Sequence, residues 1–383
     1  MSVILPKAIT DTINTLEKAG FEAWCVGGAV RDLILGKTPY DYDITTNALP
    51  DDIILLFEKT VPTGIKHGTV TVIADGSNIE VTTYRSDGGY TDHRAPDSVS
   101  FIASVEEDVK RRDFTVNSIL YNPEKGFYDP ENGIADINAK TIRAVGEPDK
   151  RFKEDALRIL RAFRFSAQLD FSIEPKTLTS AVTLSPLLKE ISVERVFSEL
   201  HKIFLSDRPE RCEPLFSHNA FRFCGINGSD FGIMSRLPRS FPLRFAYYCT
   251  ENRLDAKAIL KTLKADNKTA DDSECYMKIL SSPIPTEKRE LKRLMHLFGS
   301  ECVEIYCNAD ELHFNKNPHL AADFRKIIEK NEPFTVSQLD ISGTDLMSVG
   351  LKGAEIGKTL NTLLEAVIND PGLNKKDILI NLI

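Results

Sequence analysis

The sequence predicts an α+β fold in which a mixed or antiparallel sheet with helices forms the N-terminal part and helices form the remainder. Residues 69–73 and 79–84 alternate in polarity on either side of Asp-Gly-Ser at 75–77, a pattern typical of a β-hairpin. Beyond about residue 142, apolar residues recur at helical spacing. The change of period places the end of the α+β part near that residue.

Short patterns predict the elements around the hairpin. Residues 7–19 carry apolar side chains at helical spacing, and residues 23–26 form a strand that runs into a glycine pair. A helix follows over 30–35 and a strand over 41–45. Residues 86–98 are too polar and glycine-rich for regular structure, which predicts a mobile loop. In the helical remainder, we expect breaks near 206–209, 265–273 and 281–286.

Composition favours an ordinary soluble protein. The 383 residues are 42% apolar, and no apolar run approaches the ~18 residues that cross a membrane. The first seven residues lack the pattern of a signal peptide. Seven cysteines without a Cys-x-x-Cys pair argue against a disulfide framework or zinc cluster. We therefore expect a cytoplasmic protein that does not contact membranes.

The chain is acidic overall but contains one locally basic segment. The net charge of −8 counts against RNA as a substrate, since nucleic-acid binders are commonly basic. Residues 143–165, however, hold seven Lys/Arg against four Asp/Glu. Because local charge matters more than the total, this segment is compatible with binding one compact RNA.

Two short motifs predict phosphate and metal binding. Gly27 and Gly28 precede Arg31, which suits a backbone that approaches phosphates closely. Asp41 and Asp43 would share one face of a strand, close enough to hold Mg²⁺ together. Alone, each motif is more often a plain turn or a solvated loop. Together they indicate nucleotidyl transfer with two metal ions.

The segment 153–169 predicts a helix that reads a base. Its apolar residues fill one sector, while Asp155, Arg158, Arg161 and Arg164 lie on the other. The simpler alternative is an amphipathic surface helix with weak ion pairs. An arginine that only donates, beside an aspartate that only accepts, matches the amine and ring nitrogen of cytosine or adenine and mismatches guanine and uracil. Arg161 and Arg164 would extend the positive face towards phosphate.

The order of these motifs resembles the class II tRNA nucleotidyltransferase/poly(A) polymerase family, and within it the bacterial CCA-adding members. The matching motifs span about residues 21–205. They are Gly-Gly-Ala-Val-Arg-Asp at 27–32, Asp-Tyr-Asp at 41–43, Arg-Arg-Asp-Phe-Thr-Val-Asn at 111–117 and Glu-Asp-Ala-Leu-Arg at 154–158.

The resemblance implies a polymerase-β-like nucleotidyltransferase head followed by an all-helical neck, body and tail. Combined with the predicted breaks, it divides the chain into a head at 1–142, a neck at 143–205, a body at 206–275 and a tRNA-binding tail at 276–383.

The resemblance also implies roles for individual residues. Arg112 matches the family arginine that contacts the nucleotide, and Asp113 and Asn117 could touch ribose or triphosphate. An aspartate that caps a helix is the plainer alternative for Asp113. Glu80 could be a third metal carboxylate or an exposed strand residue. The helix over 191–204 would support the nucleotide-binding helix.

The activity that the resemblance implies is the addition of C, C and A to the 3′ end of tRNA from CTP and ATP, with Mg²⁺ as cofactor. Poly(A) polymerase, a partial CC- or A-adding enzyme and a non-catalytic RNA-binding protein are the alternatives. The acidic chain, the absence of a long basic tail and the loop over 86–98 favour CCA addition. The family also suggests a homodimer.

Overall fold

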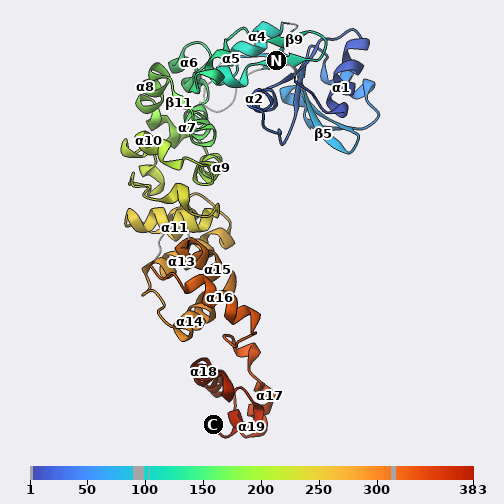
Figure 1. The fold of residues 1–383 in the computed structure, drawn as a ribbon. Coiled ribbons are helices and arrows are strands. Elements are labelled where there is room, and N and C mark those ends of the chain that lie inside the picture. Colours follow the sequence, from blue (N-terminus) through green and yellow to red (C-terminus); the bar gives the residue numbers. More distant parts are fainter. Residues whose placement is uncertain (1–2, 89–98, 103, 312–315) are drawn as a thin grey trace. The chain divides into compact units, whose positions relative to one another are not determined.

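The computed structural model describes residues 3–88, 99–102, 104–311 and 316–383 (Figure 1). These residues form two compact units, Met1–Ser229 and Asp230–Ile383. Within the described ranges, none of the helices has the length and apolar character needed to span a membrane. The predicted four-part division of the chain is finer than these two units and stays a prediction.

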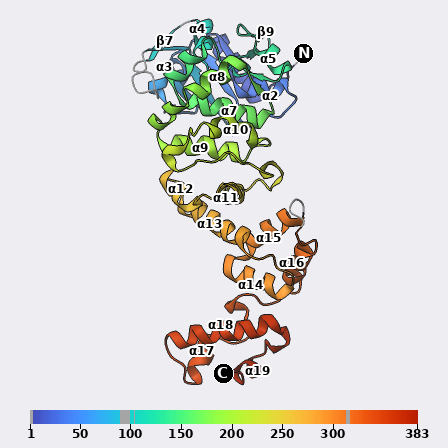
Figure 2. The same ribbon diagram turned by 90° about the vertical axis from the view of Figure 1, so that its left-hand side faces the viewer.

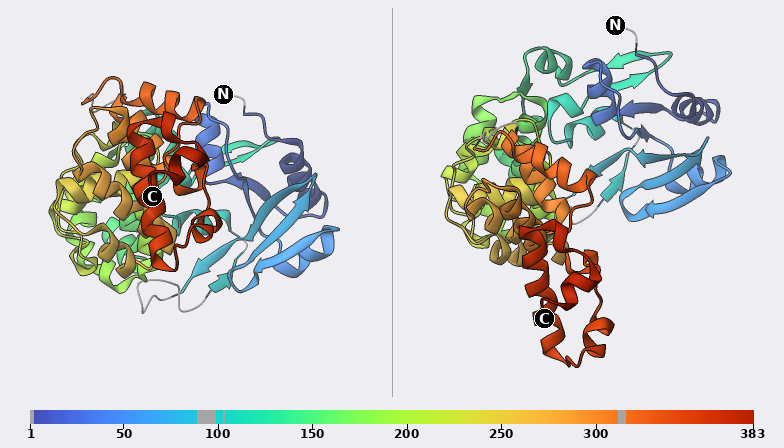
Figure 3. Two further views of the ribbon diagram at one scale, coloured as in Figure 1. Left: turned by 90° about the horizontal axis from the view of Figure 1, so that it is seen from below. Right: turned by 60° about the horizontal axis from the view of Figure 1, so that its bottom comes forward.

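A seven-stranded mixed sheet forms the centre of the N-terminal part (Figure 3). Its strand order is β3-β4-β5-β2-β1-β8-β9, in which only β2 and β5 run parallel among neighbours. The hairpin of β4 and β5 confirms the prediction from alternation. The strands are β1 (Ala23–Val26), β2 (Asp43–Thr46), β3 (Thr60–Gly64), β4 (Thr69–Ala74), β5 (Ser77–Thr83), β8 (Leu120–Asn122) and β9 (Gly126–Tyr128).

Strand β1 lies inside this sheet and is buried on both faces, which explains its uninterrupted apolar run. Trp24 and Val26 point to one face, where they pack in a cluster with Val105 and Val109 of a short helix. Helix α1 also packs against β1. The helices that accompany the sheet are α1 (Lys7–Lys18), α2 (Gly28–Ile34), α3 (Pro50–Leu56), α4 (Val105–Lys110) and α5 (Gly133–Asn138).

Two small sheets add detail that the periodicity did not predict. Strands β6 (Arg85–Asp87) and β7 (Val99–Phe101) pair antiparallel, so regular structure extends into the start of the loop predicted over 86–98. Residues 89–98 of that loop lie outside the described residues. Strands β10 (Thr141–Ile142) and β11 (Ser172–Ile173) pair in parallel, which corrects the expectation of an all-helical chain beyond residue 142.

Helices complete the first unit, and α7 packs directly against α9 (Figure 2). The single helix predicted over 153–169 is wrong in one respect, because the chain breaks between α6 and α7. The Oδ1 atom of Asp155 accepts a hydrogen bond from the Leu157 amide at 3.0 Å, and so satisfies a donor at the start of the new helix. These helices are α6 (Pro148–Glu154), α7 (Leu157–Leu169), α8 (Pro175–Thr183), α9 (Val193–Phe204) and α10 (Glu213–Ser217).

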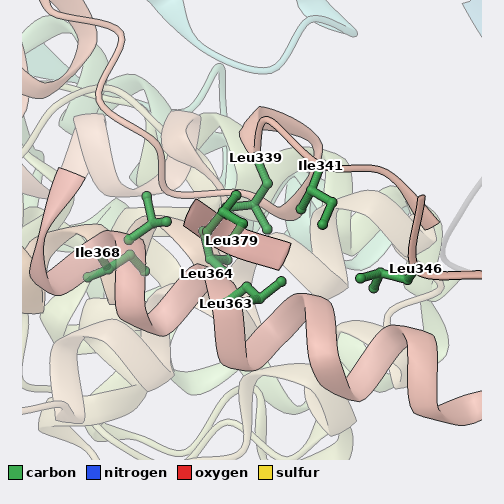
Figure 4. Close-up of a cluster of buried hydrophobic side chains, with 8 residues drawn as sticks. Leu339, Ile341, Leu346, Leu363, Leu364, Ile368 and Leu379 are labelled. Atoms are coloured by element: carbon green, nitrogen blue, oxygen red, sulfur yellow. The ribbon is translucent and has the colours of Figure 1, made fainter. Parts of the chain in front are cut away.

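The second unit is built from helices. The break predicted near 265–273 is confirmed only at its start, because α12 ends at Thr262 and Asp266 caps a helix that begins at Asn267. A separate apolar cluster forms the core at the C-terminal end of this unit. It includes Leu363, Leu364, Leu379 and Leu346 (Figure 4). The helices are α11 (Phe241–Glu251), α12 (Ala256–Thr262), α13 (Asn267–Ser281), α14 (Lys288–Phe298), α15 (Ser300–Ala309), α16 (Leu320–Glu329), α17 (Gly343–Ser348), α18 (Ala354–Asn369) and α19 (Lys376–Ile380).

Candidate active site

A polar pocket of about 400 Å³ brings the four sequence motifs of the first unit together. Six arginines and three aspartates contribute to its wall, so the pocket favours an anionic ligand. The lining residues are Gly27, Gly28, Arg31, Asp43, Arg111, Arg112, Asp113, Asn117, Asp155, Leu157, Arg158, Arg161, Phe165 and Arg195. Of the predicted and candidate site residues, Asp41, Glu80 and Arg164 are not part of this lining.

The glycine pair turns the chain from β1 into α2 at the edge of the pocket. Gly27 has a φ of +79°, which L side chains rarely adopt, so glycine is required at this position. A Cβ atom there would also lie 3.7 Å from Asp43 Oδ2. The backbone at Gly27 therefore runs directly beside the carboxylate that the sequence predicts to bind metal.

Arg31 follows on α2 and is almost fully buried. Its Nε donates to Asp32 Oδ1 at 2.9 Å, and its Nη1 donates to Asn117 Oδ1 at 2.7 Å. These two bonds hold the guanidinium rigidly at the pocket wall. Its predicted role in nucleotide binding is consistent with this placement and stays a prediction.

The carboxylates of Asp41, Asp43 and Glu80 gather at a second hollow of about 520 Å³ beside the pocket. Asp43 begins strand β2, whereas Asp41 precedes it, so the expectation that both lie on one strand is wrong. Glu80 lies opposite Asp43 in the parallel pairing of β2 and β5. Asp43 lines both hollows and therefore connects them.

The electrostatics of Asp43 fit a cation site. Desolvation by the surrounding walls, together with repulsion from Asp41 and Glu80, raises the pKa of Asp43 to about 6, although Arg112 opposes the shift. Among the described residues, no group of three or more His, Cys, Asp or Glu side chains is arranged to hold a metal ion. The chain thus supplies two neighbouring carboxylates, and substrate phosphates would have to complete the coordination, as is usual for Mg²⁺.

Arg111 and Arg112 are anchored from behind by one buried carboxylate. Asp108 on α4 accepts hydrogen bonds from Arg111 Nη2 at 2.6 Å and from Arg112 Nη2 at 3.0 Å. Burial alone would raise the pKa of Asp108, but the two guanidinium groups outweigh it and lower that pKa. Arg112 Nε is buried without a hydrogen-bond partner in the described part of the chain. An arginine held this way presents a preformed donor to an anion.

Asp113 connects the 111–117 segment to α7. Its Oδ2 accepts from Arg161 Nε at 2.7 Å, and its Oδ1 accepts from Asn117 Nδ2 at 3.3 Å. Burial would raise the pKa of Asp113, but Arg161 and Arg158 lower it to about 2. Asn117 ends a single 3₁₀ turn, Thr115–Asn117, so the α-helix that Asp113 would cap in the plainer alternative is absent.

Phe165 on α7 provides a flat surface for three guanidinium groups. The Cζ atoms lie 5.2 Å from the ring centroid for Arg31, 5.3 Å for Arg161 and 4.2 Å for Arg164. Such cation–π contacts are worth ~0.5–2 kcal/mol each, depending on desolvation. The ring therefore holds like charges close together at one end of the pocket.

Asp155 and Arg158 lie at the break between α6 and α7, and each already has partners. Asp155 Oδ2 accepts from Arg195 Nη2 at 3.0 Å. Arg158 Nη1 donates to Glu154 Oε2 at 2.8 Å, and its Nη2 donates to the Arg111 carbonyl at 2.9 Å. The two predicted base-reading side chains are thereby held at the same pocket in fixed orientations.

Arg164 forms an ion pair with Glu199 of α9. Its Nε lies 2.9 Å from Glu199 Oε2. Residues spaced by three fall behind by about 60° per step around a helix, so Arg164 lies roughly 120° from Arg158. Arg164 therefore does not line the pocket as Arg158 and Arg161 do, although its guanidinium lies against the Phe165 ring.

Sequence reasoning missed four contributors to the site, namely Asp108, Arg111, Phe165 and Arg195. The helix that carries Arg195 was predicted, but only as a support, and the arginine lines the pocket itself. Its Nη1 atom is buried without a hydrogen-bond partner among the described residues. Arg195 is one of four charged residues on the segment 191–204, so no signal in the sequence distinguished it.

Comparison with known proteins places the whole chain in one family. Three family models match successive parts: Poly A polymerase head domain at 23–143, Probable RNA and SrmB- binding site of polymerase A at 170–223, and tRNA nucleotidyltransferase domain 2 putative at 243–383. A CCA-adding enzyme from Pediococcus pentosaceus is 35% identical over 96% of this chain and 95% of the relative. The chain belongs to the CCA-adding enzyme family. A second CCA-adding enzyme, from Streptococcus mutans, is 34% identical over 99% of this chain and 98% of its own.

The fold agrees with that of a solved CCA-adding enzyme. The crystal structure of the Bacillus stearothermophilus CCA-adding enzyme in complex with CTP matches with a TM-score of 0.86 at 31% identity, over 99% of this chain and 97% of that one. This likeness confirms the polymerase-β-like nucleotidyltransferase head and the largely helical remainder. It also confirms the family resemblance drawn from the motifs, and CCA-adding enzymes are tRNA nucleotidyltransferases.

Proposed function

We propose that this chain adds C, C and A to the 3′ end of tRNA from CTP and ATP, without a nucleic-acid template and with release of pyrophosphate. The observation that carries the proposal is the placement of Asp155 and Arg158 on the same pocket as Asp43. The first two would choose the base, and the third would act at the triphosphate. Relatives named CCA-adding enzyme along the full chain support the same activity.

Base selection follows from the donors and acceptors in the pocket. Asp155 can accept from the N4 amine of cytosine or the N6 amine of adenine, while Arg158 donates to the adjacent ring nitrogen. Uracil and guanine present a carbonyl and an N–H in these places, so each meets a like group. Asp155 accepts from Arg195 and from the Leu157 amide, and Arg158 donates to Glu154, so the pair is fixed before a nucleotide binds. The protein itself would thus replace a template.

Phosphate binding falls to the arginines on the remaining pocket wall. Arg31 is fixed by Asp32 and Asn117, and Arg112 lines the pocket with its Nη2 held by Asp108. Arg161 is oriented by Asp113 and by the ring of Phe165. Rigid donors such as these stabilise negative charge without reorganising during the reaction. We assign the triphosphate to this part of the pocket.

Asp41 and Asp43 would hold Mg²⁺, and Glu80 is near enough to raise the pKa of Asp43. When bound, two divalent ions lower the pKa of the attacking 3′-hydroxyl and neutralise the leaving pyrophosphate. The chain itself binds and orients the two substrates in line, which is most of the catalysis in phosphoryl transfer. The identity of the ion as Mg²⁺ is part of this proposal, because it rests on the oxygen ligands alone.

The remaining expectations complete the proposal. The partner would be tRNA, whose binding the resemblance assigns chiefly to residues 276–383. A homodimer and a cytoplasmic location stay predictions from the sequence and the resemblance.

The test is to offer purified protein a tRNA that ends before CCA, with each nucleotide alone and in mixtures, and to sequence the new 3′ ends. We expect CC with CTP, CCA with CTP and ATP, and no extension with UTP or GTP. A run of adenosines would indicate a poly(A) polymerase instead. Ends that stop at CC would indicate a partial enzyme, and unchanged ends with tRNA bound would indicate a binding protein.

A further inference from the structure

One face of the large sheet borders the hollow that contains the metal carboxylates. Glu80 on β5 lies opposite Asp43 on β2 and opposite Thr71 on β4. Thr71 in turn lies opposite Val61 on β3. Cross-strand partners point to the same face of a sheet, and alternation adds Ile73, two residues after Thr71. These side chains line the hollow of about 520 Å³.

Two apolar side chains on this face are exposed. Val61 is 43% exposed and Ile73 is 38% exposed, whereas Val70 and Val72 on the opposite face of β4 are buried. Single exposed apolar residues are common on protein surfaces. Val61 and Ile73, however, are diagonal neighbours across β3 and β4 and line the same hollow as the metal carboxylates. They give that hollow an apolar floor.

The charges around the hollow argue against a triphosphate there. None of the described residues that line it is basic, whereas Asp41, Asp43 and Glu80 are acidic. The neighbouring pocket is lined by six arginines. A triphosphate is therefore attracted to the pocket and repelled from the hollow. An uncharged base and its ribose suit the hollow better.

Asp43 connects the two cavities, since it is the one residue that the described linings of both share. In nucleotidyl transfer, the 3′-oxygen forms a bond to the α-phosphorus, its proton is released, and the bond to pyrophosphate breaks. The attacking and leaving oxygens lie roughly in line on opposite sides of that phosphorus. If the triphosphate occupies the arginine pocket, the attacking hydroxyl has to approach the metal carboxylates from another cavity.

We propose that this hollow binds the 3′-terminal nucleotide of tRNA, with its base against Val61 and Ile73 and its 3′-hydroxyl directed to Asp41 and Asp43. The inference rests on the proposed function, because it names where the second substrate of that reaction lies. It adds an acceptor site to the nucleotide pocket.

The chemistry of the hollow fits an acceptor whose base changes. Before the first addition the terminal base is the tRNA's own, and before the next two it is cytosine. An apolar floor can contact the flat face of any base. Thr63 Oγ1 and Thr71 Oγ1, which also line the hollow, lie 2.9 Å apart. Because hydroxyls both donate and accept, this pair can adapt to different base edges.

Photochemical crosslinking tests the proposal without catalysis. The probe is a tRNA that ends before CCA and carries 4-thiouridine as its 3′-terminal residue. It is bound to the full-length protein without CTP, irradiated and digested with trypsin. Cleavage after Lys59, Lys66 and Arg85 gives peptides 60–66 and 67–85, which carry the apolar floor and both threonines. We expect the crosslink on one or both of these peptides.

A double variant tests the same floor by kinetics. Val61→Ser with Ile73→Ser should lower the rate of each of the three additions at saturating tRNA and nucleotide by about 5- to 30-fold. The affinity for CTP and the ratio of CTP to UTP incorporation should stay unchanged, because the nucleotide pocket is unaltered. Val61→Ile with Ile73→Val keeps the floor apolar and should recover most of the rate.

Leu55→Ser on α3 is the matched control, because Leu55 is 84% exposed and does not line the hollow. Circular dichroism checks that each variant is folded. The inference is overturned if the bound tRNA labels neither peptide, or if the double serine variant adds all three nucleotides at the normal rate. If the unaltered protein adds no nucleotide, the proposed function fails, whereas the crosslink still decides where the 3′ end lies.

Discussion

Asp155 Oδ2 accepts a hydrogen bond from Arg195 Nη2 at 3.0 Å, across 40 residues of sequence. The bond ties the break between α6 and α7 to helix α9. Because the Leu157 amide occupies Asp155 Oδ1, both carboxylate oxygens are oriented before a base arrives. Arg195 is therefore a positioning residue for the proposed base recognition.

Replacing Arg195 should loosen base selection without abolishing activity. Loss of one charge-assisted hydrogen bond costs ~1.5–3 kcal/mol, and part of this cost would lower the affinity for CTP. We expect Arg195→Ala to lower kcat/KM for CTP about tenfold and to narrow the ratio of CTP to UTP incorporation. Arg195→Lys should recover part of that ratio. An unchanged ratio in the alanine variant would show that the bond is only structural.

Removing Asp155 should change which nucleotide is accepted. The Asp155→Ala variant lacks the acceptor for the amine but keeps Arg158, whose donors can reach the O4 atom of UTP. A bidentate base contact is worth ~1–3 kcal/mol, so UTP misincorporation relative to CTP should rise roughly 5- to 150-fold. Single-nucleotide primer extension measures it.

Arg158→Ala is the counterpart, because it should lower the incorporation of CTP and ATP alike without increasing that of UTP. If Asp155→Ala lowers the incorporation of all four nucleotides equally, the assignment of base recognition to this pair is wrong.

The metal carboxylates can be tested without altering shape. We expect Asp41→Asn and Asp43→Asn each to reduce nucleotide addition by more than about 100-fold, because charge stabilisation of the transferring phosphoryl group is lost. Binding of tRNA should stay nearly intact, since it depends on phosphate contacts elsewhere. Chelation should abolish activity in the unaltered protein and added Mg²⁺ should restore it.

Asp51→Asn, an exposed carboxylate on α3, is the matched control and should retain full activity. Addition within tenfold of normal in either metal-site variant would remove the two-metal assignment.

Phe165 should act through the arginines that rest on its ring. Phe165→Leu keeps an apolar side chain but removes the cation–π contacts with Arg31 and Arg161, each worth ~0.5–2 kcal/mol. We expect KM for CTP to rise about three- to tenfold with a smaller change in kcat. Phe165→Tyr retains the ring and should leave KM for CTP unchanged. Equal effects of both changes would show that the ring does not position the arginines.

The pair of Asp113 and Arg161 should make stability depend on pH. The pKa of Asp113 is about 2 in the folded chain, below its usual value of 3.8, so its contribution is present above pH 4 and lost as the pH falls towards 2. The shift corresponds to about 2 kcal/mol. Asp113→Asn should therefore lower the free energy of unfolding by about 2–4 kcal/mol at pH 7, and by less below pH 4.

Fluorescence of Trp24, the single tryptophan, reports urea unfolding of the first unit for this test. The exposed Asp11→Asn on α1 is the control and should change the free energy of unfolding by under about 0.5 kcal/mol. If the difference in free energy of unfolding between Asp113→Asn and the unaltered protein stays constant down to pH 3, the proposed linkage to the Asp113 pKa is wrong.

Short-range patterns in the sequence were enough to predict the hairpin of β4 and β5, the glycine turn after β1 and the helices α1, α2, α7 and α9. Each depends on backbone geometry or side-chain period within a few residues, which the sequence displays directly. The motif order in the chain also identified the family, which the comparisons confirmed. The apolar sector of α7 was predicted correctly as well, and Ile159, Leu160 and Phe163 are fully buried.

Tertiary structure alone decided which charged groups meet. The parallel register of β2 and β5 sets Glu80 opposite Asp43, and the packing of α9 on α7 gives Arg195 to Asp155 and Glu199 to Arg164. An ionised side chain can pair with any opposite charge within reach, so its sequence neighbours do not determine its partner. The packing of distant elements determines the partner. Of the three arginines at three-residue spacing on α7, Arg164 pairs with Glu199, whereas Arg158 and Arg161 line the pocket.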